Sequence, residues 1–158
     1  IFLSAPFNIT DEFEELNLSN VEDFIVIEDL LSGGGLMKIH KNISSNEHSP
    51  EEIVASYAEN KFSQQSIHTF LTSLSQILSE LALAYMPGRG IYIAGGLMRS
   101  LHQFIDVESF MREFLVNRKS MHANVLGQMP LAIINQEMTC LYGSLNFINK
   151  LSFNLKKN

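Results

Sequence analysis

The sequence has a single cysteine, Cys140, in 158 residues. A lone thiol excludes an intramolecular disulfide and any metal site that is built from several thiolates. Charge is also scarce, because Asp, Glu, Lys and Arg make up only 18% of the chain. That share is low for a surface that faces water on every side. We therefore expect another domain or a partner to cover part of it.

Basic residues are the scarcer of the two signs: 11 Lys and Arg stand against 17 Asp and Glu, for a formal net charge of −6. A nucleic-acid binder needs a basic face that neutralises phosphates, and an acidic surface is repelled by anionic membranes. The sequence also lacks an apolar run long enough to span a bilayer, and it lacks a basic leader. We therefore expect a cytoplasmic protein that binds neither nucleic acid nor membrane.

What the sequence does contain is enough apolar material, 46% of the residues, for one domain with one core. Short apolar runs alternate with segments of helical periodicity, of which 62–86 is the longest. This alternation predicts an α/β domain with a mostly buried sheet. Residues 1–6 are expected to end a strand, and Thr10 to cap a short acidic helix. The other predicted strands are 24–27, 91–94 and 131–134, and the other predicted helices start at Leu36 and Pro50 or span 97–104, 107–116 and 138–151.

Two glycine-rich junctions follow two of the predicted strands. Ser32 precedes the glycines 33–35, and Gly95-Gly96-Leu97 follows the strand 91–94. Glycine allows a ligand to approach the backbone closely, and a helix N-terminus offers free N–H groups to a phosphate or a ribose. The alternative is a tight turn with close helix packing. Neither junction is a P-loop or a G-x-G-x-x-G motif.

In their order, these motifs resemble those of bacterial ATP-dependent glucokinases. Glu28 with 31–36 is similar to the family's E-x-x-L-S-G-x-G-L segment, and 91–97 is similar to its A-G-G segment. Weaker matches follow in the family's order along nearly all of the chain: Ala5-Pro6, Phe104, Phe110, Phe114, 130–134 and 141–143.

The resemblance implies an actin-like ATPase fold of two α/β domains, with nucleotide and sugar in the cleft between them. Residues 1–158 would then form one α/β domain, most of the larger C-terminal one, with a mixed sheet packed by helices. The N-terminal domain would be missing from this sequence. The resemblance further implies ATP and Mg²⁺ as cofactors, glucose as the substrate, and a homodimer.

Residue by residue, Glu28 inherits the role of a glucose ligand, since a carboxylate accepts hydrogen bonds from sugar hydroxyls. The alternative for Glu28 is a helix-capping or solvated acid. The residues that inherit a place beside ATP are Gly33, Gly34, Gly35, Gly95, Gly96, Leu97 and Gly143.

The chain has no match to the family's D-x-G-G-T phosphate loop, nor to the segment that bears its aspartate base. No catalytic residue and no metal ligand is therefore assigned in these 158 residues, and we expect the isolated chain to be inactive. Met138-Thr139-Cys140 stands where the family has N-P-G, beside the adenine. This departure keeps a second hypothesis open, a non-catalytic module derived from the kinase fold that binds a sugar or another protein.

Overall fold

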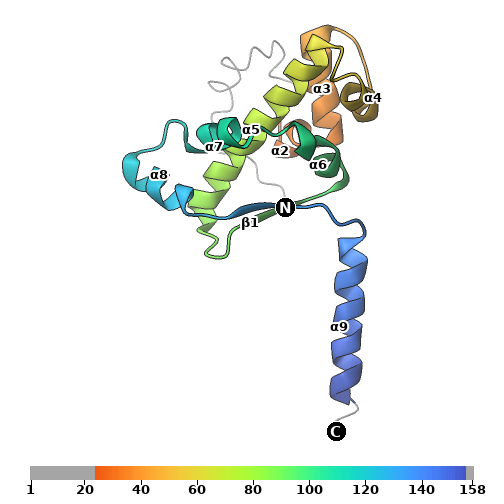
Figure 1. Ribbon diagram of the computed structural model, residues 1–158, viewed down its shortest axis with the longest axis vertical. Coiled ribbons are helices and arrows are strands. Elements are labelled where there is room, and N and C mark those ends of the chain that lie inside the picture. Colours follow the sequence, from red (N-terminus) through yellow and green to blue (C-terminus); the bar gives the residue numbers. More distant parts are fainter. Residues whose placement is uncertain (1–23, 156–158) are drawn as a thin grey trace.

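The computed structural model of the chain describes residues 24–155. Helices dominate, and two short strands form the sheet of the described part (Figure 1). The strand end expected at 1–6 and the helix expected after Thr10 lie outside the described residues. In chain order the elements are α2 (Ile27–Leu30), α3 (Gly33–Ser44), α4 (Pro50–Ala55), α5 (Lys61–Tyr85), β1 (Ile91–Ala94), α6 (Gly96–Leu101), the 3₁₀ helix η2 (His102–Phe104), α7 (Val107–Leu115), α8 (Ser120–Gly127), β2 (Leu131–Ile134) and α9 (Thr139–Leu155).

The long helix α5 forms the centre of the molecule, and it confirms the predicted helix over 62–86 almost to the residue. Asn60 caps its start by accepting the N–H of Phe62 at 2.9 Å. Met86 ends it in the left-handed conformation, with φ 44°, just before Pro87. The apolar spacing therefore sets the body of this helix, and its polar cap and its proline set the ends.

The core lies where α5 packs against its neighbours. One cluster joins α5 to α3, α4 and α6. A second, smaller cluster of Ala82, Phe114 and Leu126 joins the far half of α5 to α7 and α8. A buried hydroxyl also links these helices, since Ser75 of α5 donates to the carbonyl of Phe110 at 2.7 Å. The first cluster contains the fully buried side chains Leu36, Ile39, Ile53, Ile67 and Leu101.

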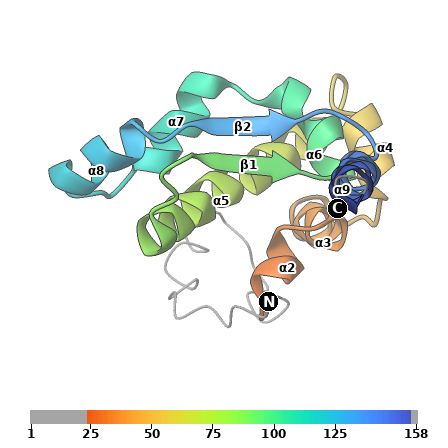
Figure 2. The ribbon, with the colours of Figure 1, turned by 90° about the horizontal axis from the view of Figure 1, so that it is seen from below.

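The sheet pairs β1 with β2 in parallel, from Ile91 opposite Leu131 to Ala94 opposite Ile134. Both strands were predicted, but two expectations about the sheet are wrong. Among the described residues the sheet is parallel rather than mixed, and the described helices cover only one of its faces. Figure 2 shows the strands in front of the helical body, and Tyr92, on the open face, is 63% exposed. Strands are buried on both faces only when helices cover both, and here the described helices cover one.

The predicted strand 24–27 is wrong, because helix α2 begins at Ile27. The carboxylate of Asp29 accepts the backbone N–H groups of Ile25 (3.2 Å) and Val26 (3.1 Å). These local bonds satisfy donors that a strand would have paired across a sheet. The apolar run therefore indicates neither a strand nor burial here, since Ile25 is 78% exposed.

The start of α3 differs from the prediction as well, and the difference concerns the site. We expected the three glycines to form a loop ahead of a helix at Leu36. The helix begins at Gly33, with Ser32 as its cap and with the Ser32 hydroxyl accepting the N–H of Gly35 at 3.0 Å. The glycines therefore form the first turn of α3.

Candidate functional site

The corner between α2 and α3 separates two neighbouring acids into different roles. Lys38 donates to Asp29 at 2.7 Å. That hydrogen bond, and then the one from the Val26 N–H, hold the pKa of Asp29 below its ordinary value. Asp29 therefore holds α2 against α3. The carboxylate of Glu28, next to it, is exposed, with no hydrogen-bond or ion-pair partner among residues 24–155.

A cavity of about 220 Å³ lies at this corner. Its mixture of a carboxylate, an ammonium group, a hydroxyl and bare backbone suits a small polar ligand. Sequence reasoning found Glu28 but missed Lys38, although Lys38 lies four residues after Gly34 and so on the same face of α3. The lining residues are Val26, Glu28, Asp29, Ser32, Gly34, Gly35 and Lys38.

A larger cavity, of about 500 Å³, lies between α3, α4 and α6. Gly33 and Gly96 both line it, although they are far apart in the sequence. The arrowheads of β1 and β2 point toward the end of the molecule where α3 and α4 lie (Figure 2), and α/β sheets bind their ligands beyond the carboxyl ends of strands. Besides the two glycines, the lining residues are Pro50, Glu51, Val54, Ala55, Leu97 and Ser100.

The first turn of α3 contributes to both cavities. Gly33 lines the larger cavity, whereas Gly34 and Gly35 line the smaller one beside Glu28. We call the larger one the inter-glycine cavity and the smaller one the Glu28 cavity. One helical turn thus forms a wall of each.

The packing interpretation of the glycines applies to Gly35 and does not apply to Gly33 and Gly96. A Cβ on Gly35 would lie 2.1 Å from the carbonyl oxygen of Leu30, so Gly35 is required for packing. A Cβ on Gly33 would lie 3.5 Å from Pro50, and one on Gly96 would lie 3.7 Å from Arg99, which are ordinary contacts. The fold therefore has room for a side chain at Gly33 and Gly96, and the cavity beside them would lose that room.

Gly95 needs to be glycine for a reason of backbone conformation. Its φ is +140°, which other residues rarely adopt, and no atom lies within 4 Å of the position that its Cβ would occupy. Gly143 differs again, because it lies on the exposed helix α9 and outside both cavities. The structure thus brings Gly33, Gly96 and Leu97 together and leaves Gly143 apart.

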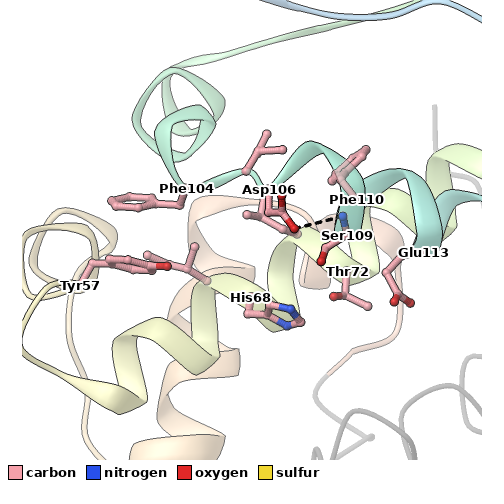
Figure 3. Close-up of a pocket in the computed structure, with 11 residues that line it drawn as sticks. Tyr57, His68, Thr72, Phe104, Asp106, Ser109, Phe110 and Glu113 are labelled. Atoms are coloured by element: carbon pink, nitrogen blue, oxygen red, sulfur yellow. Dashed lines mark hydrogen bonds between the residues drawn. The ribbon is translucent and has the colours of Figure 1, made fainter.

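A third cavity, between α5, η2 and α7, is much smaller, at about 80 Å³ (Figure 3). Tyr57 and Phe104 stack at one end with ring centroids 4.1 Å apart. Asp106 accepts the N–H of Ser109 at 3.2 Å and so caps α7. Ligand pockets usually enclose roughly 300–1,000 Å³, so this cavity is too small for a nucleotide, whereas the inter-glycine cavity falls in that range.

The starts of two helices, at Gly33 and Gly96, line one cavity beside a pair of parallel strands, which is an α/β arrangement. Among solved structures, a glucokinase from an Antarctic psychrotroph is similar to this chain, with a TM-score of 0.62 and 23% identity, over 87% of this chain and 44% of that one. The family model named Glucokinase matches residues 7–151. The chain therefore belongs to the glucokinase family.

Curated relatives agree with this assignment at low identity. A glucokinase of Chelativorans sp. is 24% identical over 88% of this chain and 42% of its own length. One of Aromatoleum aromaticum is 28% identical over 77% of this chain and 39% of its own length. The chain thus spans about two fifths of the length of these relatives.

None of the helices in the described part has the length and apolar character needed to cross a membrane.

Proposed function

We propose that this chain is the C-terminal part of a glucokinase, an enzyme that transfers the γ-phosphoryl group of ATP to glucose and gives glucose 6-phosphate. The observation that carries the proposal is the meeting of the two glycine junctions at one cavity, with the Glu28 cavity on the other side of the same helical turn. A kinase needs two ligand sites side by side, because phosphoryl transfer depends on positioning the two substrates.

The inter-glycine cavity is the nucleotide side of this proposal. Gly33 and Gly96 leave no Cβ between backbone and ligand, and Leu97 adds an apolar contact for a base. The first N–H groups of the twelve-residue helix α3 lack partners within the helix, apart from those that Ser32 takes up. The backbone donors suit the phosphates of a nucleotide, and the apolar wall suits its base.

The Glu28 cavity is the sugar side. The carboxylate of Glu28 is exposed, so its oxygens can accept hydrogen bonds from two sugar hydroxyls. Its neighbour Asp29 is already engaged with Lys38 and the backbone, which leaves Glu28 as the acid available to a ligand in this cavity.

The described residues do not fit a Mg²⁺ site. Between Phe24 and Leu155 there is no group of three or more His, Cys, Asp or Glu side chains that could hold a metal ion. We therefore propose that Mg²⁺, the phosphate loop and the catalytic base belong to an N-terminal domain that completes the actin-like fold. The open face of the sheet and the exposed apolar side chains of α9 support this proposal, since both need a cover.

The test uses the full-length protein and two substitutions with matched controls. Glu28→Gln should lower kcat/KM for glucose about tenfold to a hundredfold and leave the KM for ATP unchanged, because each charge-assisted hydrogen bond contributes about 1.5–3 kcal/mol. Gly96→Ala should do the reverse and raise the KM for ATP. Glu108→Gln on α7 and Gly127→Ala at the end of α8 make the same chemical changes away from both cavities. A rise in the ATP KM on Glu28→Gln would contradict the assignment of the two sides.

The second hypothesis is a non-catalytic assembly module. The observation in its favour is α9, on which large apolar side chains are exposed: Leu145 is 57% and Phe147 is 64% exposed. A full-length protein whose Tm does not rise with ATP at millimolar concentration would favour this alternative over the kinase.

A further inference from the structure

A series of hydrogen-bonded polar side chains connects α3, α5 and the segment between α3 and α4. His40 of α3 is fully buried, and its Nδ1 atom is 2.9 Å from the hydroxyl oxygen of Ser66 on α5. Its Nε2 atom is 3.1 Å from Nδ1 of His48, in the connection between α3 and α4. The two imidazole rings meet edge to face, with centroids 5.1 Å apart. Both nitrogens of a buried histidine are thus engaged.

The hydrogen bond between Ser66 and Phe62 determines where the protons lie in this series of side chains. Ser66 contacts the carbonyl oxygen of Phe62 at 2.7 Å, and a carbonyl can only accept, so the Ser66 proton is committed there. Nδ1 of His40 must therefore donate to Ser66. Neutral His40 then has a bare Nε2 atom, which accepts the Nδ1–H of His48. Each group therefore donates to the next: His48 to His40, His40 to Ser66, and Ser66 to the backbone of α5.

His48 connects this series to the cavity wall. The next residue, Ser49, caps α4: its hydroxyl accepts the N–H of Glu52 at 3.3 Å, and its own N–H donates to the Glu52 carboxylate at 2.7 Å. The residues between them, Pro50 and Glu51, line the inter-glycine cavity. The place of this wall therefore depends on where His48 is held.

The histidine pair accepts one added proton without losing its contact, because an imidazolium N–H still faces a bare nitrogen. A second proton places N–H against N–H, and the hydrogen bond is lost. Burial first, and then the charge of His48, lower the pKa of His40 from its ordinary value. Its neutral form is favoured in the fold, so this contribution to stability is complete above about pH 6.5 and is lost as the pH falls below it.

The other charged groups around the pair lie on α2, α3, α4 and α5 and on the connection between α3 and α4. The pKa of Glu52 is lowered by its hydrogen bonds to Ser49 and, to a smaller degree, by the charge of His48. The remaining groups are two ion pairs, Lys41 with Glu47 beside His48 and Asp29 with Lys38 between α2 and α3, and the exposed Lys61 and His68 on α5. His48 is the group that acts on the pKa of His40 among these described residues.

We propose that His48, His40 and Ser66 form a proton-sensitive latch that fixes the Pro50–Glu51 wall of the inter-glycine cavity, and that double protonation of the two histidines releases this wall. His48 is then a positioning residue, and the latch adds acid sensitivity to the nucleotide side. The consequence for nucleotide binding rests on the proposed function. The latch itself rests on the geometry alone.

The first experiment observes the latch without any ligand. Nitrogen NMR of the imidazoles in the 158-residue chain should show His40 with its proton on Nδ1 at about pH 7.5. Between that pH and about pH 5, the amide protection factors of Glu52 and Ile53, whose N–H groups bond to Ser49, should fall about tenfold after correction for intrinsic exchange. His40 protonated on Nε2 at neutral pH, or protection that stays constant, would overturn the latch.

The variant that tests the mechanism is His48→Gln. A glutamine amide can donate to neutral His40, or turn and accept from the imidazolium, and it does not titrate. The loss of protection on acidification should therefore fall to less than about twofold in His48→Gln. His68→Gln, the same change on an exposed histidine of α5, should behave like the wild type. Equal pH sensitivity in the wild type and His48→Gln would overturn the proposal.

The second experiment measures ATP binding to the full-length protein over the same pH range. The Kd of the wild type and of His68→Gln should rise about tenfold more than that of His48→Gln, and this comparison cancels the protonation of ATP itself. A protein that binds no ATP at any pH but keeps the NMR behaviour would contradict the proposed nucleotide site and leave the latch standing. ATP binding with equal pH dependence in all three proteins would contradict the link from latch to cavity.

Discussion

Two regions of this molecule are both rich in apolar residues and differ in burial. In the helical body, formed by α3, α5 and α7, Ile39 is fully buried and Ile67 is 1% exposed. In the arm, formed by α9 together with the open face of β1 and β2, Tyr92 is 63% and Leu145 is 57% exposed. Figure 1 shows α9 extending away from the body, and every described side chain from Thr139 to Lys150 is exposed.

The difference shows that an apolar sequence does not by itself determine whether a segment is buried. Helix α9 has apolar side chains on several faces, and Lys150 is its only charged residue between 139 and 155. A helix that is apolar on most faces is normally enclosed by other elements. The low share of charged residues in the whole chain is thus partly explained by this nearly uncharged helix.

The largest expected contrast concerns local opening in the 158-residue chain. An isolated helix of the length of α9 is marginal in water, so its amides should exchange almost as fast as those of an unfolded peptide. The central amides of α5 should be protected up to the global stability, of about 5–15 kcal/mol. Hydrogen exchange measured by mass spectrometry checks both regions at once, and comparable protection in α9 and α5 would remove the distinction between body and arm.

The second contrast compares two large-to-small substitutions. Ile39→Ala should cost about 2–5 kcal/mol, because it leaves a cavity where the side chain was fully enclosed. Leu145→Ala, at an exposed position of α9, should change stability by less than about 0.5 kcal/mol. Urea unfolding of both variants tests this. If the two values agree, α9 is packed in solution.

The third contrast uses one change, glycine to alanine, in both regions. Gly35→Ala should destabilise the body by about 1–3 kcal/mol, since its Cβ would meet the backbone of Leu30 at 2.1 Å. The Cβ of Gly143→Ala would have no atom within 4 Å, and the substitution should stabilise the helical form of α9 by about 0.5–1 kcal/mol. Circular dichroism and thermal melts of the two variants show whether the effects have opposite signs.

The smallest expected effect is the acid response of the body. The pKa of folded Asp29 lies below its ordinary value, chiefly because Lys38 donates to it. Its contribution to stability is thus present above the ordinary pKa of about 3.8 and is lost as the pH falls through the folded one. Both Asp29→Asn and Lys38→Met should make the loss of Tm on acidification less steep than in the wild type. A wild-type slope in both variants would show that this pair contributes nothing to the body.

Much of the fold could be predicted from periodicity. The helix α5 and the strands β1 and β2 follow directly from apolar spacing and from the flanking glycines and prolines. Helix α8 was not expected, because Lys119 offers it no side-chain cap and Leu126 is its only buried residue. The strand predicted at 24–27 was wrong because one carboxylate caps the backbone there.

The candidate site was predictable in its residues and not in its arrangement. The glycines at 33 and 96 are visible in the sequence, but their meeting at one cavity depends on how α3, α4 and α6 pack. The contact between His40 and His48 is equally hidden, since their spacing matches no ligand motif and only the loop after Ser45 brings the rings together. The roles of Glu28, Gly33, Gly34, Gly35, Gly95, Gly96, Leu97 and Gly143 stay predictions.

The first turn of α3 has a consequence for the energetics of binding. Gly33 lines one cavity and Gly34 lines the other, so the backbone of a single helical turn would separate the occupants of the two cavities. Whatever free energy one occupant gains by shifting this turn must appear, with equal size, in the affinity for the other. Since these glycines lack the side chains that would stiffen the wall, the coupling between the two ligands would be carried by the backbone itself.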